Sequence, residues 1–144
     1  IIKDSVVLEG DVRSMSDEAR EMVESQIRQM AEGLATTYGV SIELEYANDY
    51  PILYNDPAIT DRVQAALEGA SIPEIKAVVK TAPQPPSEDF AYYLKEKPGC
   101  FFYVGARPAE GPWYPHHHPK FDINEDSLII SAKAMAAVVA DFCG

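Results

Sequence analysis

The stretch SMSDEAREMVESQIRQMAEGLATTYG, residues 14–39, decides how the first third of the chain is expected to fold. Ser16 offers an N-cap side chain, and the two acidic residues after it suit the first turn of a helix. Apolar residues then recur at spacings of three and four, which place them on one helix face. They are Ala19, Met22, Val23, Ile27, Met30 and Leu34. Gly39 suits the helix end because glycine adopts the left-handed conformation readily.

The segments on either side of this helix have the alternation of half-buried strands. In residues 6–13 apolar and polar side chains alternate, and in residues 40–46 the alternation is strict. The pattern therefore predicts a strand–helix–strand unit over residues 1–50, with one side facing solvent. Such a unit cannot bury its apolar face alone, so a partner from the same chain or from another chain is expected.

The middle of the chain predicts a second group of elements. Asp56 followed by Pro57 is a cap-and-first-turn signature, and a short helix is expected after it. Residues 74–80 have the composition of a strand. A proline-rich bend follows, and Ser87 is expected to cap another short helix.

The last third alternates in the same way. The continuous apolar run at residues 100–106 is typical of a central strand buried on both faces. Residues 107–120 are rich in Gly, Pro and His and predict a loop. The final helix, from about residue 125 to 142, is apolar nearly all round and is expected to be packed on several sides. Alternating helices and strands favour an α/β fold class.

Composition excludes several classes of function. Twelve basic and 23 acidic residues give a net charge of −11, which would repel nucleic acid. No apolar run approaches the roughly 20 residues of a membrane-spanning helix, so no membrane association is expected. Cys100 and Cys143 are far apart and form no C-x-x-C pair. This usage fits a reducing compartment, and the cytoplasm is the expected location.

All three histidines lie side by side in PHHHPKFDINEDSL, residues 115–128. If the segment is extended, His116 and His118 share one side and His117 faces away. Catalytic zinc requires three protein ligands, and the H-E-x-x-H helix signature is absent. The spacing therefore disfavours a complete metal site within this chain and favours a polar loop with exposed imidazoles.

Other candidate groups have plain structural explanations beside the functional ones. Glu88 and Asp89 could form an acid/base pair, or they could be first-turn acids placed after a Ser87 cap. Arg13 shares a strand face with acidic residues, where a surface ion pair contributes little. Cys100 lies in an apolar run, in which a thiol is usually inert packing.

The order of four motifs is more informative than any one of them. LEGDVRS (8–14), YGVSIELEY (38–46), SEDFAYYLKEKPGCFFYVGA (87–106) and HHPKFDINEDSL (117–128) follow one another along the chain. Together they resemble the di-metal aminoacylase/carboxypeptidase family of metal-dependent amidohydrolases. That family includes hippurate hydrolases, N-acetyl-diaminopimelate deacetylases and auxin-conjugate amidohydrolases. The resemblance covers nearly the whole chain.

The resemblance implies a place for each part of the sequence. Residues 1–50 would be the second half of a lid, or dimerisation, domain, and residues 51–144 the C-terminal part of a zinc-peptidase-like catalytic domain. The family's H-x-P-x-F histidine is a metal ligand, and its position here is His117. Glu88 and Asp89 would lie near the active-site floor.

The family's other metal ligands and its glutamate general base lie upstream of the lid domain, and no such motifs occur here. The resemblance thus implies a C-terminal fragment of an enzyme with two divalent ions (zinc, manganese or cobalt), acting on an N-acyl amino acid or peptide-like substrate. The fragment alone is expected to be inactive, to hold no metal stably, and to form a homodimer through residues 1–50. Two alternatives stay open: a non-catalytic self-association module, and a small metal-binding domain built on the His116–His118 loop.

Overall fold

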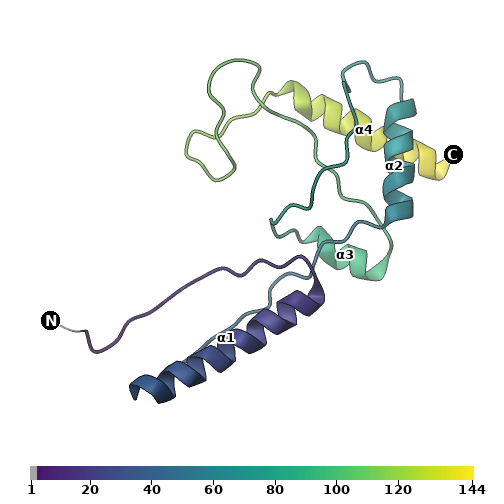
Figure 1. The fold of residues 1–144 in the computed structure, drawn as a ribbon. Coiled ribbons are helices and arrows are strands. Elements are labelled where there is room, and N and C mark those ends of the chain that lie inside the picture. The colour runs from purple at the N-terminus through teal and green to yellow at the C-terminus, as the bar shows by residue number, and fades with distance from the viewer. Residues whose placement is uncertain (1–2) are drawn as a thin grey trace. The chain divides into compact units, whose positions relative to one another are not determined.

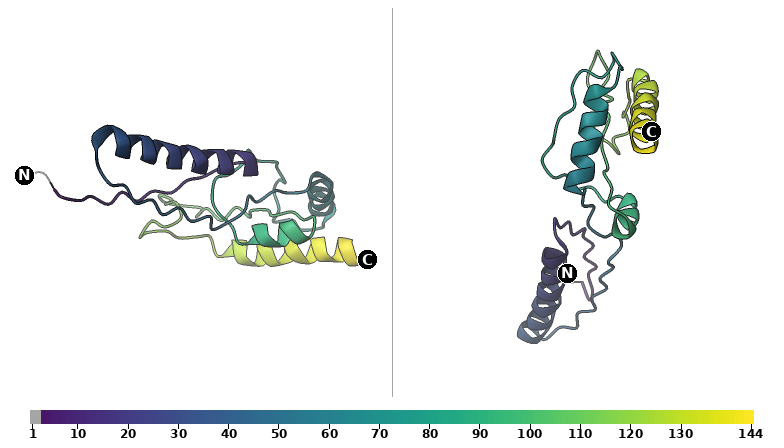
Figure 2. Two further views of the ribbon diagram at one scale, coloured as in Figure 1. Left: turned by 90° about the horizontal axis from the view of Figure 1, so that it is seen from below. Right: turned by 90° about the vertical axis from the view of Figure 1, so that its right-hand side faces the viewer.

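The computed structural model describes residues 3–144, which form four α-helices joined by extended segments (Figures 1 and 2). The helices are α1 (Asp17–Tyr38), α2 (Pro57–Gly69), α3 (Phe90–Glu96) and α4 (Asp126–Cys143). The chain divides into two compact units. The first runs to Leu53 and includes residues 82–92; the second comprises residues 54–81 and 93–144.

The sequence predicts all four helices correctly, and both of its capping predictions for α1 are confirmed. The Ser16 hydroxyl accepts a hydrogen bond from the Ala19 N–H at 3.1 Å at the start of α1. Gly39 ends that helix at φ 63°, in the left-handed region. Because these signals act within a few residues of each other, they fix the helix bounds locally.

The predicted α/β fold class is wrong, because residues 3–144 contain no β-strand. The segments expected as strands, 6–13, 40–46, 74–80 and 100–106, are extended but have no ladder. A strand requires a neighbour about 4.8 Å away with repeated hydrogen bonds. Here extended segments are joined by single backbone bonds, such as Asp56 N–H to the Gly99 carbonyl at 2.9 Å. Alternation predicts which side chains share a face, but it cannot supply a neighbouring strand.

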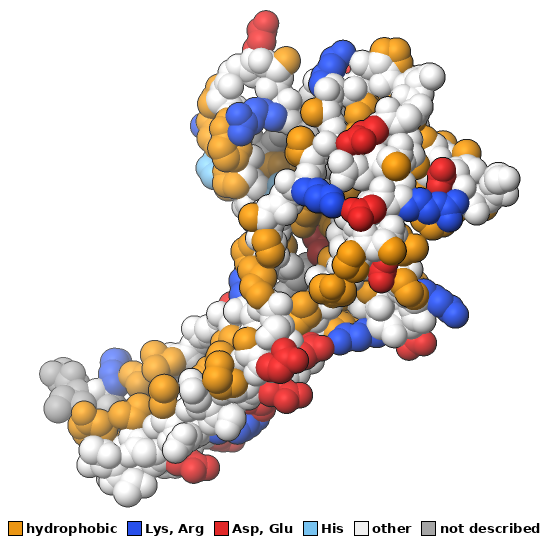
Figure 3. All heavy atoms as spheres, turned by 45° about the vertical axis from the view of Figure 1, so that its right-hand side comes forward, with side chains coloured by type: hydrophobic (Ala, Val, Ile, Leu, Met, Phe, Trp, Pro, Cys, Tyr) orange, Lys and Arg blue, Asp and Glu red, His pale blue; other side chains and the backbone are white. Residues whose placement is uncertain are grey.

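The first unit is built on α1, and none of the 22 residues of that helix is buried. Both extended segments of the unit run beside α1 in Figure 1, and hydrophobic side chains are visible at its surface in Figure 3. A polar contact links the helix to the segment after it. The Asn48 amide donates to the Glu24 carboxylate at 2.6 Å, and Arg28 binds the same carboxylate at 2.7 Å.

The second unit contains the hydrophobic core, where α2 packs against α4. Val63 and Leu67 of α2 and Ala134 of α4 are buried at the centre. Partly buried residues surround them: Ile59, Ile75, Val78, Cys100, Phe102 and Val138. Cys100 therefore has the packing role that the sequence indicated.

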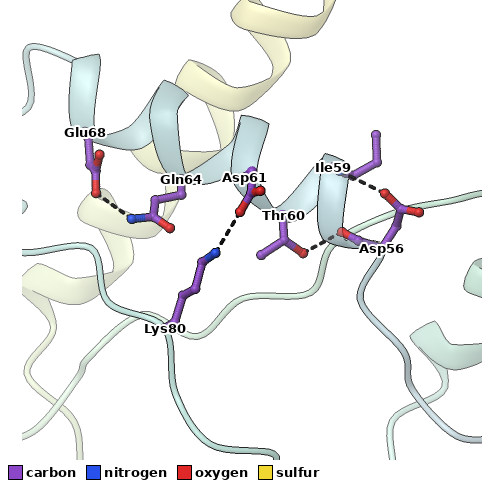
Figure 4. A network of polar contacts seen from close by, with 7 residues as sticks. All are labelled: Asp56, Ile59, Thr60, Asp61, Gln64, Glu68 and Lys80. Atoms are coloured by element: carbon purple, nitrogen blue, oxygen red, sulfur yellow. Dashed lines mark hydrogen bonds and ion pairs between the residues drawn. The ribbon is translucent and has the colours of Figure 1, made fainter.

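Polar contacts hold the first half of α2. At the start, the Asp56 carboxylate accepts from the Ile59 N–H at 2.9 Å, which confirms the predicted cap (Figure 4). On the outer side, Lys80 reaches the Asp61 carboxylate at 2.7 Å. Arg62 binds Asp141 near the end of α4, with Nε to Oδ2 at 2.6 Å. These contacts tie α2 to segments that follow it in the sequence.

The composition of α4 predicts a helix packed on several sides, and this prediction is wrong. Ser127 and Ala134 are buried, but Leu128 is 62% exposed. Further large apolar residues of the helix are also exposed: Ile129, Met135, Val139 and Phe142. Among the helices of the described chain, α2 is the one that packs on α4, and Ile75, Val78 and Phe102 of the extended segments lie against the same core. No helix in residues 3–144 combines the length and apolarity needed to cross a membrane.

Two local features lie around α3. The helix begins at Phe90, so Ser87 is too far upstream to be its N-cap, and that prediction is wrong. Beyond the helix, Asn55 pairs with the backbone of Phe101: its Oδ1 accepts the N–H and its Nδ2 donates to the carbonyl, both at 2.8 Å. The Asn55 amide thus makes the pair of bonds that a neighbouring strand would make.

Candidate functional site

The histidines lie in a loop between α3 and α4, and we refer to residues 114–121 as the histidine loop. A backbone bond from the Asn124 N–H to the Ala106 carbonyl, at 2.9 Å, closes the longer segment that carries it. Asn124 also accepts the Asp126 N–H through Oδ1 at 3.0 Å, at the start of α4. The histidine loop is therefore fixed on one side to the core helix.

Two consecutive turns shape the histidine loop. The His118 N–H donates to the Pro115 carbonyl at 3.2 Å, and the Phe121 N–H donates to the His118 carbonyl at 2.9 Å. His117 is the third residue of the first turn and has φ 67°, as a type II turn requires at that position. The assumption of an extended segment is thus wrong, because residues 115–118 reverse direction.

The turns give the three imidazoles different surroundings. The His118 ring stacks on Tyr114 with centroids 4.4 Å apart and 12° between planes, and its Nδ1 accepts the Lys120 N–H at 3.0 Å. The His116 ring meets Phe121 edge-on at 5.0 Å. Within residues 3–144 the exposed His117 imidazole has no hydrogen bond, ion pair or ring contact. Pale blue histidine atoms reach the surface in Figure 3.

The donor chemistry of this loop fits one metal ligand but not a complete metal centre. His117 carries imidazole nitrogens that no protein group in residues 3–144 contacts, which is what a ligand position needs. However, the described residues contain no group of three or more His, Cys, Asp or Glu side chains arranged to hold a metal ion. The described residues alone therefore do not form a centre with three protein ligands.

The other predicted site residues, Glu88 and Asp89, belong to the first compact unit, whereas His117 belongs to the second. Glu88 is half-buried and Asp89 is exposed, and both precede the first residue of α3. Their carbonyls accept the N–H groups of Ala91 and Tyr92 at 3.2 and 3.0 Å. They lie at the helix entrance, although a Ser87 cap does not place them there.

Two carboxylates outside the loop have a perturbed pKa. The Asn48 amide, followed by the Arg28 guanidinium, lowers the pKa of Glu24. The Lys133 ammonium lowers the pKa of Glu74 in the second unit. Arg13 binds the Asp11 carboxylate at 2.8 Å with both side chains exposed, which agrees with a surface ion pair. Each of these contacts stabilises local structure, and none of them indicates a catalytic or binding site.

Sequence reasoning missed the aromatic partners of the histidines and the turn that separates them. A usable signal was present, because Pro119 stands at the second position of the second turn, where proline is favoured. Tyr114 and Phe121 flank the run and are spaced to reach back onto it. Prolines and aromatic residues around a histidine run therefore indicate an ordered turn rather than an extended segment.

Known proteins resemble this chain over nearly its whole length. "Putative amidohydrolase YhaA" of Bacillus subtilis is 36% identical over 143 residues, which are 99% of this chain and 36% of that protein. "Thermostable carboxypeptidase 2" of Saccharolobus solfataricus is 33% identical over 144 residues, covering 99% and 35%. "N-acetyl-L-cysteine deacetylase" of Bacillus subtilis is 34% identical over 129 residues, covering 90% and 29%. The chain spans about a third of the length of these relatives.

A solved structure named for a similar activity also matches this chain. The crystal structure of a "putative aminohydrolase" from methicillin-resistant Staphylococcus aureus is 49% identical and superimposes with a TM-score of 0.77. The match covers 88% of this chain and 32% of that one. The sequence profile of Peptidase family M20/M25/M40 matches residues 2–141. With relatives named as amidohydrolase, carboxypeptidase and deacetylase, the chain belongs to the M20/M25/M40 peptidase family.

Proposed function

We propose that this chain is part of a metal-dependent hydrolase of amide bonds, and that His117 supplies one ligand to its metal centre. The observation that carries the proposal is the His117 imidazole, which a left-handed turn holds at the surface without a partner in residues 3–144. Family membership supports the reaction class, because the relatives' names all describe cleavage of an amide or peptide bond.

The centre would take two divalent ions, zinc, manganese or cobalt, with its other ligands and its general base outside residues 3–144. Such ions supply Lewis acidity toward the amide carbonyl and the attacking water. The role of this chain is to hold the His117 donor in place. Glu88 and Asp89, at the entrance of α3, are proposed to line the active-site floor.

The proposed substrate is an N-acyl amino acid or a related peptide-like conjugate. One relative is named as an N-acetyl-L-cysteine deacetylase and others as N-acetyldiaminopimelate deacetylases, and both names describe loss of a small acyl group from an amino acid. One is named as a carboxypeptidase, whose substrate also bears a free carboxylate. The substrate class common to these names is an amide next to an amino-acid carboxylate.

The proposed partner is a second copy of the protein, bound through residues 1–50. Val6, Val7 and Leu8 are more than three-quarters exposed, and they stand in an extended segment without a ladder partner in the described chain. Unpaired extended backbone with apolar side chains favours pairing with another chain. Light scattering at high micromolar concentration would detect a dimer, and a strictly monomeric species would contradict this part of the proposal.

Replacing His117 by alanine in the full-length protein tests the function. We expect the rate of hydrolysis of N-acyl amino acids, measured by the release of the amine product, to fall by about 100-fold or more, because the loss of a metal ligand disrupts the centre. His116→Ala is the matched control, since it removes a neighbouring imidazole and should have a much smaller effect. Full activity of the His117→Ala protein would refute the ligand assignment.

The 144-residue chain provides a second test. We expect it to show no turnover of N-acyl amino acids with added zinc, manganese or cobalt, because one imidazole binds these ions weakly. Metal analysis after dialysis should find no stoichiometric ion. Chelator-sensitive turnover by this chain would mean that it carries a complete site of its own.

A further inference from the structure

The backbone at His117 needs support from its surroundings. Gly39 and Gly111 are the other residues of the described chain with positive φ, and His117 is the one that has a side chain to accommodate there. A side-chain-bearing residue stays in the left-handed region only where neighbouring contacts compensate for the strain. Because the His117 side chain itself makes no such contact in residues 3–144, the support has to come from the residues beside it.

His118 provides the most extensive of these neighbouring contacts. Its backbone closes both turns, as donor to Pro115 and as acceptor from Phe121. Its half-buried side chain stacks on Tyr114, and its Nδ1 accepts the Lys120 N–H. By comparison, the exposed His116 side chain has the edge-on ring contact with Phe121 and, within residues 3–144, no hydrogen bond to backbone. The two flanking histidines are therefore unequal.

We propose that His118 is a positioning residue that holds the turn in which His117 is presented as a metal ligand, an inference that rests on the function proposed above. The stack on Tyr114 fixes the plane of the His118 ring. The bond from Lys120 then fixes which nitrogen faces the backbone, and it holds the His118 side chain against the second turn.

The hydrogen bond also determines the tautomer of His118. A ring nitrogen that accepts an N–H bond carries no proton, so the proton of the neutral ring is on Nε2. Coordination of a metal through Nδ1 would require loss of the Lys120 bond, and coordination through Nε2 would require the Nε2 proton to move to Nδ1, which breaks the same bond. His118 therefore supports His117 and is not itself the ligand in this loop.

Three substitutions at one position separate the two side-chain contacts. His118→Asn keeps an acceptor at the place of Nδ1, because an Asn side chain bonds the N–H two residues on in the same way. His118→Phe keeps a ring to stack on Tyr114 but removes the acceptor. His118→Ala removes both contacts, and His116→Ala is the matched control.

Two readouts apply to each variant of the full-length protein: zinc affinity, by competition with a chromophoric chelator, and amide hydrogen exchange of Lys120. We expect His118→Ala to weaken zinc binding about 10-fold, the lower end of effects seen when a supporting residue is lost, and to accelerate Lys120 exchange. His118→Asn should retain Lys120 protection and His118→Phe should lose it. His116→Ala should leave zinc affinity within about 3-fold of the parent, because the His116 side chain makes no hydrogen bond to the backbone of the loop.

The outcomes distinguish this inference from the proposed function. If His117→Ala abolishes zinc binding while His118→Ala changes neither readout, the positioning role is wrong and the ligand assignment stands. If His118→Ala is as damaging to zinc affinity as His117→Ala, His118 is a ligand and the inference is also overturned. If His117→Ala leaves zinc affinity unchanged, the proposed function fails, while Lys120 exchange still tests the turn. If His118→Ala does not fold, the comparison of His118→Asn with His118→Phe decides. The inference requires Lys120 protection to be retained in the Asn variant and lost in the Phe variant.

Discussion

The two compact units differ in how they stabilise their helices. In the first unit, α1 has 22 residues and buries none of them. In the second, α2 has 13 residues and buries Val63 and Leu67 against α4. The longer helix therefore relies on capping, on contacts between neighbouring turns and on partial burial of residues such as Val23 and Ile27, whereas the shorter one has buried residues. Helix length in this molecule is no guide to burial.

The difference is one of energetics. Fully burying a Val or Leu side chain contributes about 1.5–3 kcal/mol, whereas an exposed ion pair four residues apart contributes about 0.3–0.5 kcal/mol. The Arg28–Glu24 pair of α1 is of the second kind. We therefore expect the second unit to resist unfolding more strongly, and α1 to exchange its amides sooner.

Leu67→Ala should produce the largest change in stability. Leu67 is 7% exposed, and removing a buried leucine costs about 2–4 kcal/mol when the cavity is not refilled. Leu34→Ala in α1 is the matched control: Leu34 is 50% exposed, and its loss should cost about 0.5 kcal/mol. Urea unfolding monitored by amide exchange in each helix would measure both. Equal costs would mean that Leu34 is covered in solution.

The two helix caps should differ in the extent of their effects. Ser16→Ala and Asp56→Ala each remove one side-chain acceptor, at a cost of about 1 kcal/mol. In α1 the effect should stay within the first turns, because nothing buried transmits it. In α2 it should also accelerate exchange in α4, since the two helices share a core. Identical local effects in both units would show that α2 and α4 do not unfold together.

The smallest effect concerns the Glu24 carboxyl. Asn48→Ala should raise the pKa of Glu24 toward its ordinary value, because the Asn48 amide is the main cause of its lowering. A lowered folded-state pKa stabilises the protein above the unfolded-state value, and this contribution is lost as pH falls through the folded-state pKa. NMR titration would measure the shift, with Glu74 as the control that should not change. An unchanged Glu24 pKa would show that the Asn48 bond does not form in solution.

How much of the fold the sequence predicts depends on how local the signal is. Ser16, Gly39 and Asp56 act on residues within one turn, and their predictions are confirmed. Ser87 is as local a signal, but its predicted cap is wrong because α3 begins at Phe90. The alternation at residues 40–46 correctly indicates extended backbone, but a strand also needs a partner that no local pattern names. The prediction that α4 is packed on several sides is wrong for the same reason. Composition shows which side chains could be buried, but not which segments are available to cover them.

The candidate site divides in the same way. The family resemblance, through its H-x-P-x-F motif, singles out His117, and the structure distinguishes that histidine from its neighbours by its left-handed backbone. The roles of Tyr114 and Phe121 as ring partners were not predicted, because the segment was treated as extended. A turn reverses the neighbours of each side chain, so period-two reasoning fails within it.

The pairing of Asn55 with Phe101 has a consequence for chemical ageing. Asparagine hydrolyses slowly to aspartate, and at this position the product would replace the Nδ2 donor by a carboxylate oxygen facing the Phe101 carbonyl. Two acceptors would then oppose each other where one hydrogen bond stood, while the bond from the Phe101 N–H could remain. We predict that aged samples one mass unit heavier at Asn55 lose amide protection around that contact, and unaltered protection in such samples would disprove it.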